Sequence, residues 1–521
     1  MRITNNMTTN RMLLNLNRNA RNLHRIDMQI ASQSRIQNPS DDPIIASRAL
    51  RFRTNVSEIV QFRENADRAL RWMDVTESSM SNILSSVRTV GSENLVQGAN
   101  GILTQENRQT IAAQINAFFA QMNSELNGTF AGRYVFSGFR TDRPPIATST
   151  QRFMQGTNPS HVNVEHNVHA GDMQSFPLHF WREPNGNLQK MGSMPDPDNA
   201  GQWIRDPKFT PINIINLPFR EISSSTSQLG FDRTLQNVRL TSGTTELSEA
   251  NGGIVRMSLN GSVNPYVFGQ GNFSGLRQYD PVTGDALYDT VGNPLWEVAP
   301  QQDPIIVFIP ETGEFVIPEA LKANFNGAGM TVDYDINGVV EGELNPHIFF
   351  NTIDHTYDPP RTFSQNNQDI QFEMGTNVRL TVNTQAKNAY PWQLFADLSR
   401  FMQLVNDAVP TPDISEDADA AERGFFGSVL YERFSNMIGI IEGHNLTISI
   451  EATNLGSRMN RVELIEERLE ENYETFTDLM SLNENIDLIE AMMRFNAAEA
   501  VMQAAMNVGA RISQLSLVNF L

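Results

Sequence analysis

Apolar residues recur at every seventh position near both ends of the chain, which is the spacing of a helical coiled coil. The longest row consists of Phe52, Ile59, Ala66, Met73, Met80 and Val87, with Ala49, Val56, Leu70 and Leu84 three residues before four of them. We therefore predict a long helix through this row and a third helix over residues 104–126, which stops at Gly128 because glycine favours a helix end.

The apolar stripes closest to the two ends are narrower and include polar residues. One N-terminal seam position holds Thr9, Leu16, Leu23 and Ile30, and the other holds Met12, Asn19, Ile26 and Gln33. In the C-terminal part, Val462, Leu469 and Phe476 alternate with Ile465, Leu479, Ile486 and Met493. Helical periodicity thus returns at about residue 391, breaks in a loop at residues 410–419, and continues to residue 521.

Residues 139–390 have a different character. Proline and glycine are frequent, and short runs such as Val162 with Val164, or I-I-V-F-I at 305–309, lie between turn residues. One hydrophobic core rarely serves more than about 300 residues, so we predict a multidomain α+β chain. Its predicted parts are a helical segment with a helical hairpin and the start of a β element (1–145), a β-rich inserted surface region of one or more domains (146–361), and a β element followed by C-terminal helices (362–521).

The two helical ends carry opposite charge. Residues 1–72 contain twelve Arg and six Asp plus Glu, whereas residues 455–490 contain three Arg and ten Asp plus Glu. Helices with matching heptads and complementary charge pair well. We therefore predict that the N- and C-terminal helices form one bundle with the chain ends side by side. The alternative is that both charge runs are only solvated helix faces.

Composition narrows the function classes. The formal net charge of the 521 residues is −20, which disfavours a nucleic-acid partner or an anionic membrane surface. The absence of cysteine excludes thiol chemistry and disulfides. The sequence contains no apolar run of about 18 residues, so we predict no membrane-spanning helix. The N-terminus lacks the apolar core and the cleavage site of a signal peptide.

The stretch N-P-S-D-D-P at 38–43 could be an acid pair or a helix boundary. Pro39 cannot continue a helix, and the second apolar stripe begins just after Pro43. Ser40 or Asp42 can cap the new helix, whose first turn suits Pro43. A catalytic pair needs two carboxylates in different environments, so we interpret these residues as a turn that ends one helix and starts the next.

Two short stretches of the middle region suggest metal ligands. Asp333, Asp335, Asn337 and Glu341 have the spacing of a calcium-binding loop, although its twelfth position is Leu344. The same residues also fit two strands joined by an Asn337-Gly338 hairpin turn, which we favour.

Three histidines, His161, His166 and His169, form the second candidate. On a strand His166 faces opposite the other two, so we favour polar strand faces over a metal site. No phosphate-binding loop and no nucleophile elbow occur, so we predict neither a cofactor nor an enzyme.

Four segments together resemble a known family. They are the start M-R-I-T-N-N-M-T-T-N-R-M-L-L-N-L-N-R-N-A-R-N-L, the turn Q-N-P-S-D-D-P followed by I-I-A-S-R-A-L, G-T-F-A-G-R-Y-V-F-S-G at 128–138, and N-L-G-S-R-M-N-R-V-E near the C-terminus. In this order they are similar to the flagellar hook-associated protein 3 family, the hook-filament junction proteins, which are related to flagellin. The segment E-M-G-T-N-V-R-L-T-V-N and the ending S-Q-L-S-L-V-N-F-L fit the same family.

The resemblance implies a flagellin-like bundle of terminal coiled-coil helices with an inserted β-rich region. It also implies a structural protein outside the cell, exported through the flagellar type III apparatus without a cleaved signal. The implied partners are further copies of the chain in a ring, a neighbouring hook-associated protein, flagellin and an export chaperone. The ends are expected to be poorly ordered before assembly.

We predict that assembly buries a shared coiled-coil core of Leu16, Leu23, Ile30, Phe52, Ile59, Met73, Leu469, Phe476, Ile486 and Met493. Two alternatives stay open: a minor flagellin of the filament, and a coiled-coil stalk that displays a calcium- or glycan-binding domain.

Overall fold

The structure, a computed structural model, is α+β as predicted and divides into two compact units. It describes residues 5–99, 105–176, 179–182, 188–191, 193–195, 203–205, 212–224, 230–243, 245–256, 306–317, 322, 329–366, 368–407 and 416–518. The terminal unit contains residues 1–70, 372–380 and 460–521, and the central unit contains residues 71–371 and 381–459. These limits differ from the predicted boundaries at 145 and 361. The predicted boundaries follow changes in composition along the sequence, whereas the units are defined by contacts between segments that are distant in sequence.

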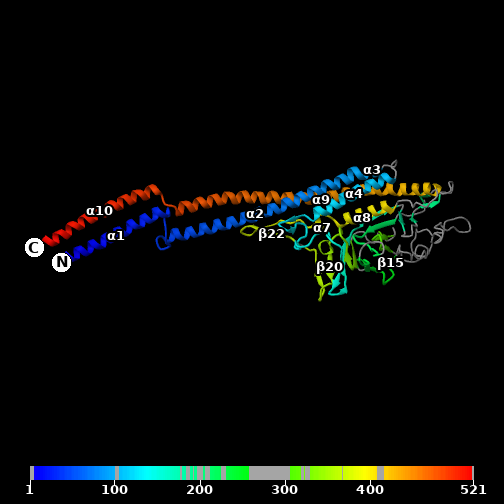
Figure 1. Ribbon diagram of the computed structural model, residues 1–521, viewed down its shortest axis with the longest axis horizontal. Helices are drawn as coiled ribbons and strands as arrows, with labels where there is room; N and C mark the ends of the chain where they lie inside the picture. Colours follow the sequence, from blue (N-terminus) through cyan, green and yellow to red (C-terminus); the bar gives the residue numbers. More distant parts are fainter. Residues whose placement is uncertain are drawn as a thin grey trace. The chain divides into compact units, whose positions relative to one another are not determined.

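Long helices dominate both ends of the chain (Figure 1). They are α1 (Asn5–Ser32), α2 (Pro43–Thr89), α4 (Gln105–Leu126), α8 (Trp392–Asp407), α9 (Glu416–Glu484) and α10 (Leu488–Val518). The shorter ones are the π-helix η1 (Val90–Leu95), α3 (Val96–Gly98), the 3₁₀ helix η2 (Ala170–Asp172), α6 (Pro346–Phe349) and α7 (Ala386–Ala389). The helices predicted through the Phe52 row and over residues 104–126 are confirmed. Helix α9 begins inside the loop predicted at 410–419, of which residues 410–415 lie outside the described residues.

In the terminal unit the two ends of the chain lie side by side, as predicted (Figure 1). Helices α1 and α10 pack against each other. The segment after α1 and the segment before α10 form an antiparallel bridge between Ser34 and Asn485. Its backbone bonds run from the Arg35 N–H to the Glu484 carbonyl at 2.7 Å and from the Ile486 N–H to the Gln33 carbonyl at 3.1 Å.

The N-P-S-D-D-P stretch is a helix boundary, which confirms the structural interpretation. Helix α1 ends at Ser32, and Gln33 follows in the left-handed region with φ 54°. The Asp42 carboxylate accepts the N–H groups of Ile44 at 3.0 Å and Ile45 at 3.1 Å, so Asp42 caps α2, which starts at Pro43.

Asp41 has a separate role in this turn. Its carboxylate accepts hydrogen bonds from the backbone N–H groups of Asn38 and Gln37, which lower its pKa. The adjacent acids therefore satisfy backbone donors on opposite sides of the turn.

A second helix boundary was not predicted. Helix α9 ends at Glu484, and α10 begins at Leu488. The Asp487 carboxylate accepts the N–H groups of Ile489 at 2.9 Å and Glu490 at 3.2 Å. Asp487 with Glu490 has the spacing of a capping box, so the signal was present in the sequence.

A six-stranded antiparallel sheet forms one part of the central unit, with the order β14-β13-β18-β6-β20-β21. Its strands are β14 (Thr245–Ser248), β13 (Leu235–Ser242), β18 (Met330–Ile336), β6 (Val162–Val168), β20 (Asn351–Asp354) and β21 (Arg361–Phe363). Along β6 buried and more exposed residues alternate, which confirms the strand predicted from Val162 and Val164.

A five-stranded sheet has the order β15-β16-β17-β12-β7. Its strands are β15 (Ile254–Arg256), β16 (Ile306–Ile309), β17 (Glu314–Ile317), β12 (Ile212–Asn216) and β7 (Gln174–Phe176). The β15-β16 pair is parallel and the others are antiparallel. All four residues of β16 are buried, which explains why the sequence shows an apolar run there rather than an alternating one.

The remaining strands form two-stranded pairs. In the central unit these are β1 (Thr129–Phe130) with β2 (Arg133–Tyr134), β3 (Gln151–Arg152) with β19 (Gly338–Val339), β4 (Met154–Gln155) with β5 (Asn158–Pro159), β8 (His179–Arg182) with β9 (Leu188–Met191), and β10 (Ser193–Pro195) with β11 (Trp203–Arg205). The hairpin of β22 (Gln371–Gly375) and β23 (Val378–Thr381) belongs mostly to the terminal unit. There Asn65 of α2 donates to the Glu373 carbonyl at 2.8 Å.

Helix α8 contacts both helices and strands within the central unit. Phe395 packs edge-on against Phe119 of α4 at 5.8 Å and against Phe349 of α6 at 6.0 Å. At its start, Trp392 contacts His166 of β6 at 4.5 Å. These aromatic contacts join the helical part of the unit to the six-stranded sheet.

The predicted Asn337-Gly338 hairpin is wrong. Residues on both sides are extended, but β18 pairs with β13 and β6, whereas β19 pairs with β3. The strands separate because Asn337 bonds elsewhere: its side chain accepts the Thr234 N–H at 3.0 Å and donates to the Asp232 carbonyl at 2.8 Å.

Asp333 and Asp335 therefore lie on a strand rather than in a calcium-type loop. Asp333 accepts hydrogen bonds from Asn163 and Arg239, and Asp335 accepts from Asn163 and Asn237. Among the described residues no group of three or more His, Asp or Glu side chains is arranged to hold a metal ion.

His166 is in the core, which corrects the prediction of polar strand faces for all three histidines. It faces away from His161 and His169 as predicted, but it is buried among Tyr334, Phe350 and Trp392. Neither ring nitrogen has a hydrogen-bond partner within the described part of the chain. Burial lowers the pKa of His166 from 6.5 to about 3.

The pKa of His166 predicts acid sensitivity. Between pH 6.5 and about 3 the unfolded chain binds a proton that the folded chain does not, so stability falls as pH falls. From pH 7.5 to 4.5 the parent chain is expected to lose about 2 to 3 kcal/mol more than His166→Phe. Urea unfolding at both pH values measures this difference. His161→Gln, on the exposed face, is the control, and an equal loss in the His166→Phe chain would contradict the prediction.

Helix α9 approaches α3 closely at Gly98. A methyl group there would meet the ring of Phe434 at 2.0 Å, whereas one at Gly439, also on α9 within the central unit, would meet nothing within 4 Å. We expect Gly98→Ala to destabilise the central unit by about 1 to 3 kcal/mol. Gly439→Ala is expected to stabilise it by about 0.5 to 1 kcal/mol. Thermal unfolding followed by tryptophan fluorescence compares them, and equal effects would contradict the close packing.

Candidate assembly surface

The inner seam between α2 and α9 in the terminal unit is apolar. Ile59 and Leu469 are buried, and the rings of Phe52 and Phe476 lie 6.5 Å apart. These residues come from opposite ends of the chain, and their heptad spacing puts them on the facing sides of the two helices.

Polar contacts flank this seam. Arg53 forms a two-pronged ion pair with Glu484, with N–O distances of 2.9 and 2.6 Å. Arg63 pairs with Glu470 and lies over the ring of Tyr473 at 5.1 Å. Each pair joins the basic and acidic segments identified in the sequence. Since these side chains are partly exposed, the pairs select the partner and register more than they stabilise.

The seam between α1 and α10 is thinner, because its α10 side consists largely of small residues. On α1 it contains Met12, Leu16, Asn19, Leu23, Ile26 and Ile30; on α10 it contains Ala491, Phe495, Ala498, Met502, Ala505 and Gly509. A methyl group at Gly509 would lie 1.9 Å from the Met12 Cε, so the helices approach closely there. A cleft of about 400 Å³ remains where Asn22, Arg25 and Gln29 face Glu490 and Arg494.

The outer faces of the same helices expose apolar side chains. Most of the large apolar residues that are exposed in the described part of the chain belong to the terminal unit. Met7, Leu14 and Met28 keep heptad spacing along α1, as do Met492 and Met506, and Val501 and Val508, along α10. The full set is Met7, Leu13, Leu14, Met28, Ile44, Leu50, Val60, Leu464, Leu479, Leu482, Leu488, Ile489, Met492, Met493, Val501, Met506 and Val508.

The ten predicted assembly-core residues fall into three groups. Ile59, Met73 and Leu469 are buried within single units; Leu16, Leu23, Ile30, Phe52, Phe476 and Ile486 are half-buried in the terminal unit; and Met493 is 61% exposed. Met73 belongs to the central unit. A shared core between copies stays a prediction for all ten.

Two residues of the predicted C-terminal seam, Leu479 and Met493, lie outside the inner seam, whereas Ile486 between them is half-buried. Leu479 is 41% exposed and Met493 is 61% exposed, whereas Ala491 faces the inner seam. The break at residues 485–487 restarts the heptad in a new register. The exposed Leu464 and Leu482 lie outside the predicted seam, because the heptads of a single helix pair define only one apolar seam.

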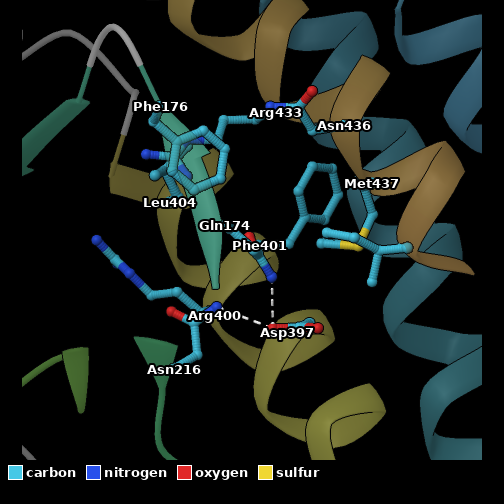
Figure 2. A pocket seen from close by; sticks show the side chains of 11 residues that line it. Gln174, Phe176, Asn216, Asp397, Arg400, Phe401, Leu404, Arg433, Asn436 and Met437 are labelled. Atoms are coloured by element: carbon cyan, nitrogen blue, oxygen red, sulfur yellow. Dashed lines mark hydrogen bonds between the residues drawn. The ribbon is translucent and has the colours of Figure 1, made fainter. Parts of the chain in front are cut away.

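The central unit contains a cluster of polar side chains that are buried rather than exposed (Figure 2). Asp397 of α8 accepts hydrogen bonds from Gln174 at 2.7 Å and Asn216 at 2.9 Å. Arg400 pairs with the buried Glu314 of β17 at 2.8 Å. The adjoining pocket has about 20 Å³ of free space, which is room for about one water molecule. These contacts fix α8 on the five-stranded sheet.

Nearby, the Arg433 guanidinium lies over the Phe176 ring at 3.0 Å, and burial lowers the pKa of Arg433 (Figure 2). A search of the described helices found none that is long and apolar enough to cross a membrane.

Comparison with known proteins places both ends of the chain in one family. The bacterial flagellin N-terminal helical region matches residues 3–141, and the bacterial flagellin C-terminal helical region matches residues 438–521. Both ends of the chain are therefore similar to the terminal regions of flagellin. The first region spans α1 to β2, and the second covers most of α9 and all of α10.

Two proteins to which this chain is similar are flagellar hook-associated proteins 3. The one from Escherichia coli strain K12 is 25% identical over 187 residues, which are 34% of this chain and 59% of that protein. The one from Salmonella typhimurium strain LT2 is 26% identical over 157 residues, which are 30% of this chain and 49% of that protein. The alignments thus span about half of each relative. They confirm the family resemblance inferred from the sequence motifs.

Among solved structures, the flagellar hook-associated protein-3 of Legionella pneumophila aligns with 82% of this chain and 97% of its own, at 14% identity and a TM-score of 0.28. That similarity is too weak to support a statement about fold or function.

The same change, leucine to alanine, is expected to affect stability differently on the inner and outer faces of the terminal unit. Leu469 is 5% exposed in the α2–α9 seam, whereas Leu464 on the same helix is 67% exposed. Leu469→Ala is expected to lower the free energy of unfolding of the terminal unit by about 2 to 4 kcal/mol. Leu464→Ala is expected to change it by less than about 0.5 kcal/mol. Urea unfolding followed by far-ultraviolet circular dichroism measures both, and a large loss with Leu464→Ala would contradict the assignment of faces.

Proposed function

We propose that the chain is a structural subunit of the bacterial flagellum, and that it forms the adaptor between a hook-associated protein and the flagellin filament. It assembles as a ring of copies through the helices of its terminal unit. Its role is structural rather than enzymatic. The observation that carries this proposal is the exposed apolar set of the terminal unit on helices that match both flagellin terminal regions.

Exposure of so many large apolar side chains favours assembly. Soluble monomers rarely leave a contiguous apolar surface of this kind uncovered. Here several exposed residues repeat at heptad spacing, in an α1 row that also contains Arg21 and an α10 row that also contains Glu499. Each helix thus presents a partly apolar row besides the seam it uses within its own chain. A helix from a neighbouring copy has the matching shape and pattern.

The thin α1–α10 seam supports a link between assembly and ordering. The alanines and the glycine on its α10 side bury little apolar surface, and the many asparagines of α1 are poor helix formers. Ordering the chain costs about 1 to 2 kcal/mol per residue. We propose that contacts with neighbouring copies supply part of this free energy, and that the ends become fully ordered only on assembly.

The proposed neighbours of the chain and its proposed location rest on the names of its relatives. Both are hook-associated proteins 3, which supports a hook-associated protein and flagellin as neighbours and a place outside the cell. Export through the flagellar apparatus without a cleaved signal, with the help of a chaperone, belongs to the same proposal. The β-rich middle of the chain is proposed to face solvent.

Charge substitutions on the outer face test the assembly surface. Leu14→Asp with Leu482→Asp places charge on residues that are 65% and 77% exposed, so the subunit should still fold. Ile353→Asp, 39% exposed on β20 of the central unit, is the matched control. Each labelled variant is expressed in cells from which the gene of the parent chain has been deleted.

The parent chain and Ile353→Asp are expected to give one spot at the base of each filament and normal motility. The Leu14→Asp, Leu482→Asp chain should be exported but give no spot, with motility reduced at least about tenfold, since burying a charge opposes association strongly. Label along the whole filament would instead indicate a minor flagellin. Normal spots with the double variant would overturn the proposed surface.

A further inference from the structure

Methionine is concentrated on the outer face of the terminal unit. The chain has 22 methionines and no cysteine, so thioethers are its only sulfur groups. The exposed methionines among the described residues are Met7, Met28, Met492, Met493, Met506 and Met154. All except Met154 lie on α1 or α10.

Exposure separates these side chains from the methionines of the core. Met492 and Met493 are 58% and 61% exposed, and Met506 is 48% exposed. By contrast Met73 and Met80 are 0% exposed. A water-soluble oxidant therefore reaches the first group and not the second while the chain is folded and unassembled.

Heptad spacing puts several of these thioethers in the rows that a neighbouring copy would cover. Met7 and Met28 lie with Leu14 in one row of α1, and Met492 and Met506 lie in one row of α10. Methionine fits irregular apolar contacts because its side chain is flexible and polarisable. Its sulfoxide is polar and disrupts such contacts.

We propose that the five exposed methionines of α1 and α10 are sites of reversible sulfur oxidation by peroxide, and that their oxidation blocks assembly of the subunit. This inference rests on the proposed function. In each step the thioether sulfur attacks one peroxide oxygen, the O–O bond breaks and an S–O bond forms. Sulfur loses two electrons to the peroxide, and water leaves after proton transfer, giving methionine sulfoxide.

Assembly should protect the same residues. Once a neighbouring copy covers the outer rows, peroxide no longer reaches their sulfur atoms. Sensitivity therefore belongs to the free subunit and not to the assembled one. Sulfoxide reductases of both stereospecificities restore the thioether, which makes the block reversible.

The first experiment treats the full chain with hydrogen peroxide and maps oxidation by peptide mass spectrometry. Met7, Met28, Met492, Met493, Met506 and Met154 are expected to react at least about tenfold faster than Met73 and Met80, following exposure. Equal rates at exposed and buried sites would overturn the proposal.

The second experiment adds labelled chain to hooks from cells that lack it, and counts the hook ends, where filament bases form, that carry the label. Peroxide treatment should reduce occupancy by the parent chain about tenfold or more, and reductase treatment should restore it. A chain with Met7, Met28, Met492, Met493 and Met506 all changed to Leu should keep its occupancy after peroxide. Met154→Leu, the matched control, should remain as sensitive as the parent chain.

The outcomes separate the two proposals. If the untreated chain fails to occupy filament bases, the proposed function fails and the oxidation proposal with it. If the untreated chain assembles and the oxidised chain assembles equally well, only the oxidation proposal fails. It also fails if the five-leucine chain loses assembly after peroxide to the same extent as the parent.

Discussion

The structure of the terminal unit depends on antiparallel pairing between the two ends of the polypeptide. Arg53 and Glu484 are 431 residues apart in sequence and form a two-pronged ion pair. The entropy cost of closing a loop grows only with the logarithm of its length, by about 0.6 kcal/mol per doubling. A middle region of any size can therefore be inserted between the ends at little cost to their pairing. This explains how a large β-rich central unit coexists with terminal regions that keep the flagellin pattern.

The pairing of the terminal helices also determines which apolar residues are left exposed and can contact other copies. The α2–α9 seam uses large apolar residues and is well buried, whereas the α10 side of the α1–α10 seam is mostly alanine and glycine around Phe495 and Met502. Other large apolar residues of α10, such as Ile489 and Met493, lie on its outer face instead. The helices nearest the chain ends thus make a weak contact with each other and keep much of their hydrophobic surface for neighbouring copies. Five of the six methionines that are exposed among the described residues lie in that surface.

The sequence predicted the long helices, the pairing of the ends and the Asp42 cap, because heptads, charge and capping residues act locally and repeat. It did not predict the break at Asp487, although the capping-box spacing to Glu490 was present, so the register of α10 was misassigned. The partner of the strand after Asn337 could not be predicted either, because pairing with β3 depends on a segment far away in sequence. His166 shows the same limit: alternation gives the face of a strand, but only tertiary packing against Trp392 and Phe350 makes that face the core.

The most direct test of end pairing uses the absence of native cysteine. Ser34 and Asn485 form a non-hydrogen-bonded pair in the antiparallel bridge, and in such pairs the Cα atoms lie about 4.5 Å apart, which is within the range of a disulfide. The Ser34→Cys, Asn485→Cys chain should form an intramolecular disulfide on mild oxidation at low protein concentration, seen as a faster-migrating monomer without reductant. A Ser34→Cys chain is the control, because its single thiol can form a disulfide only with another copy. If the Ser34→Cys, Asn485→Cys chain gives only disulfide-linked dimers, or none, the two ends do not pair within one chain.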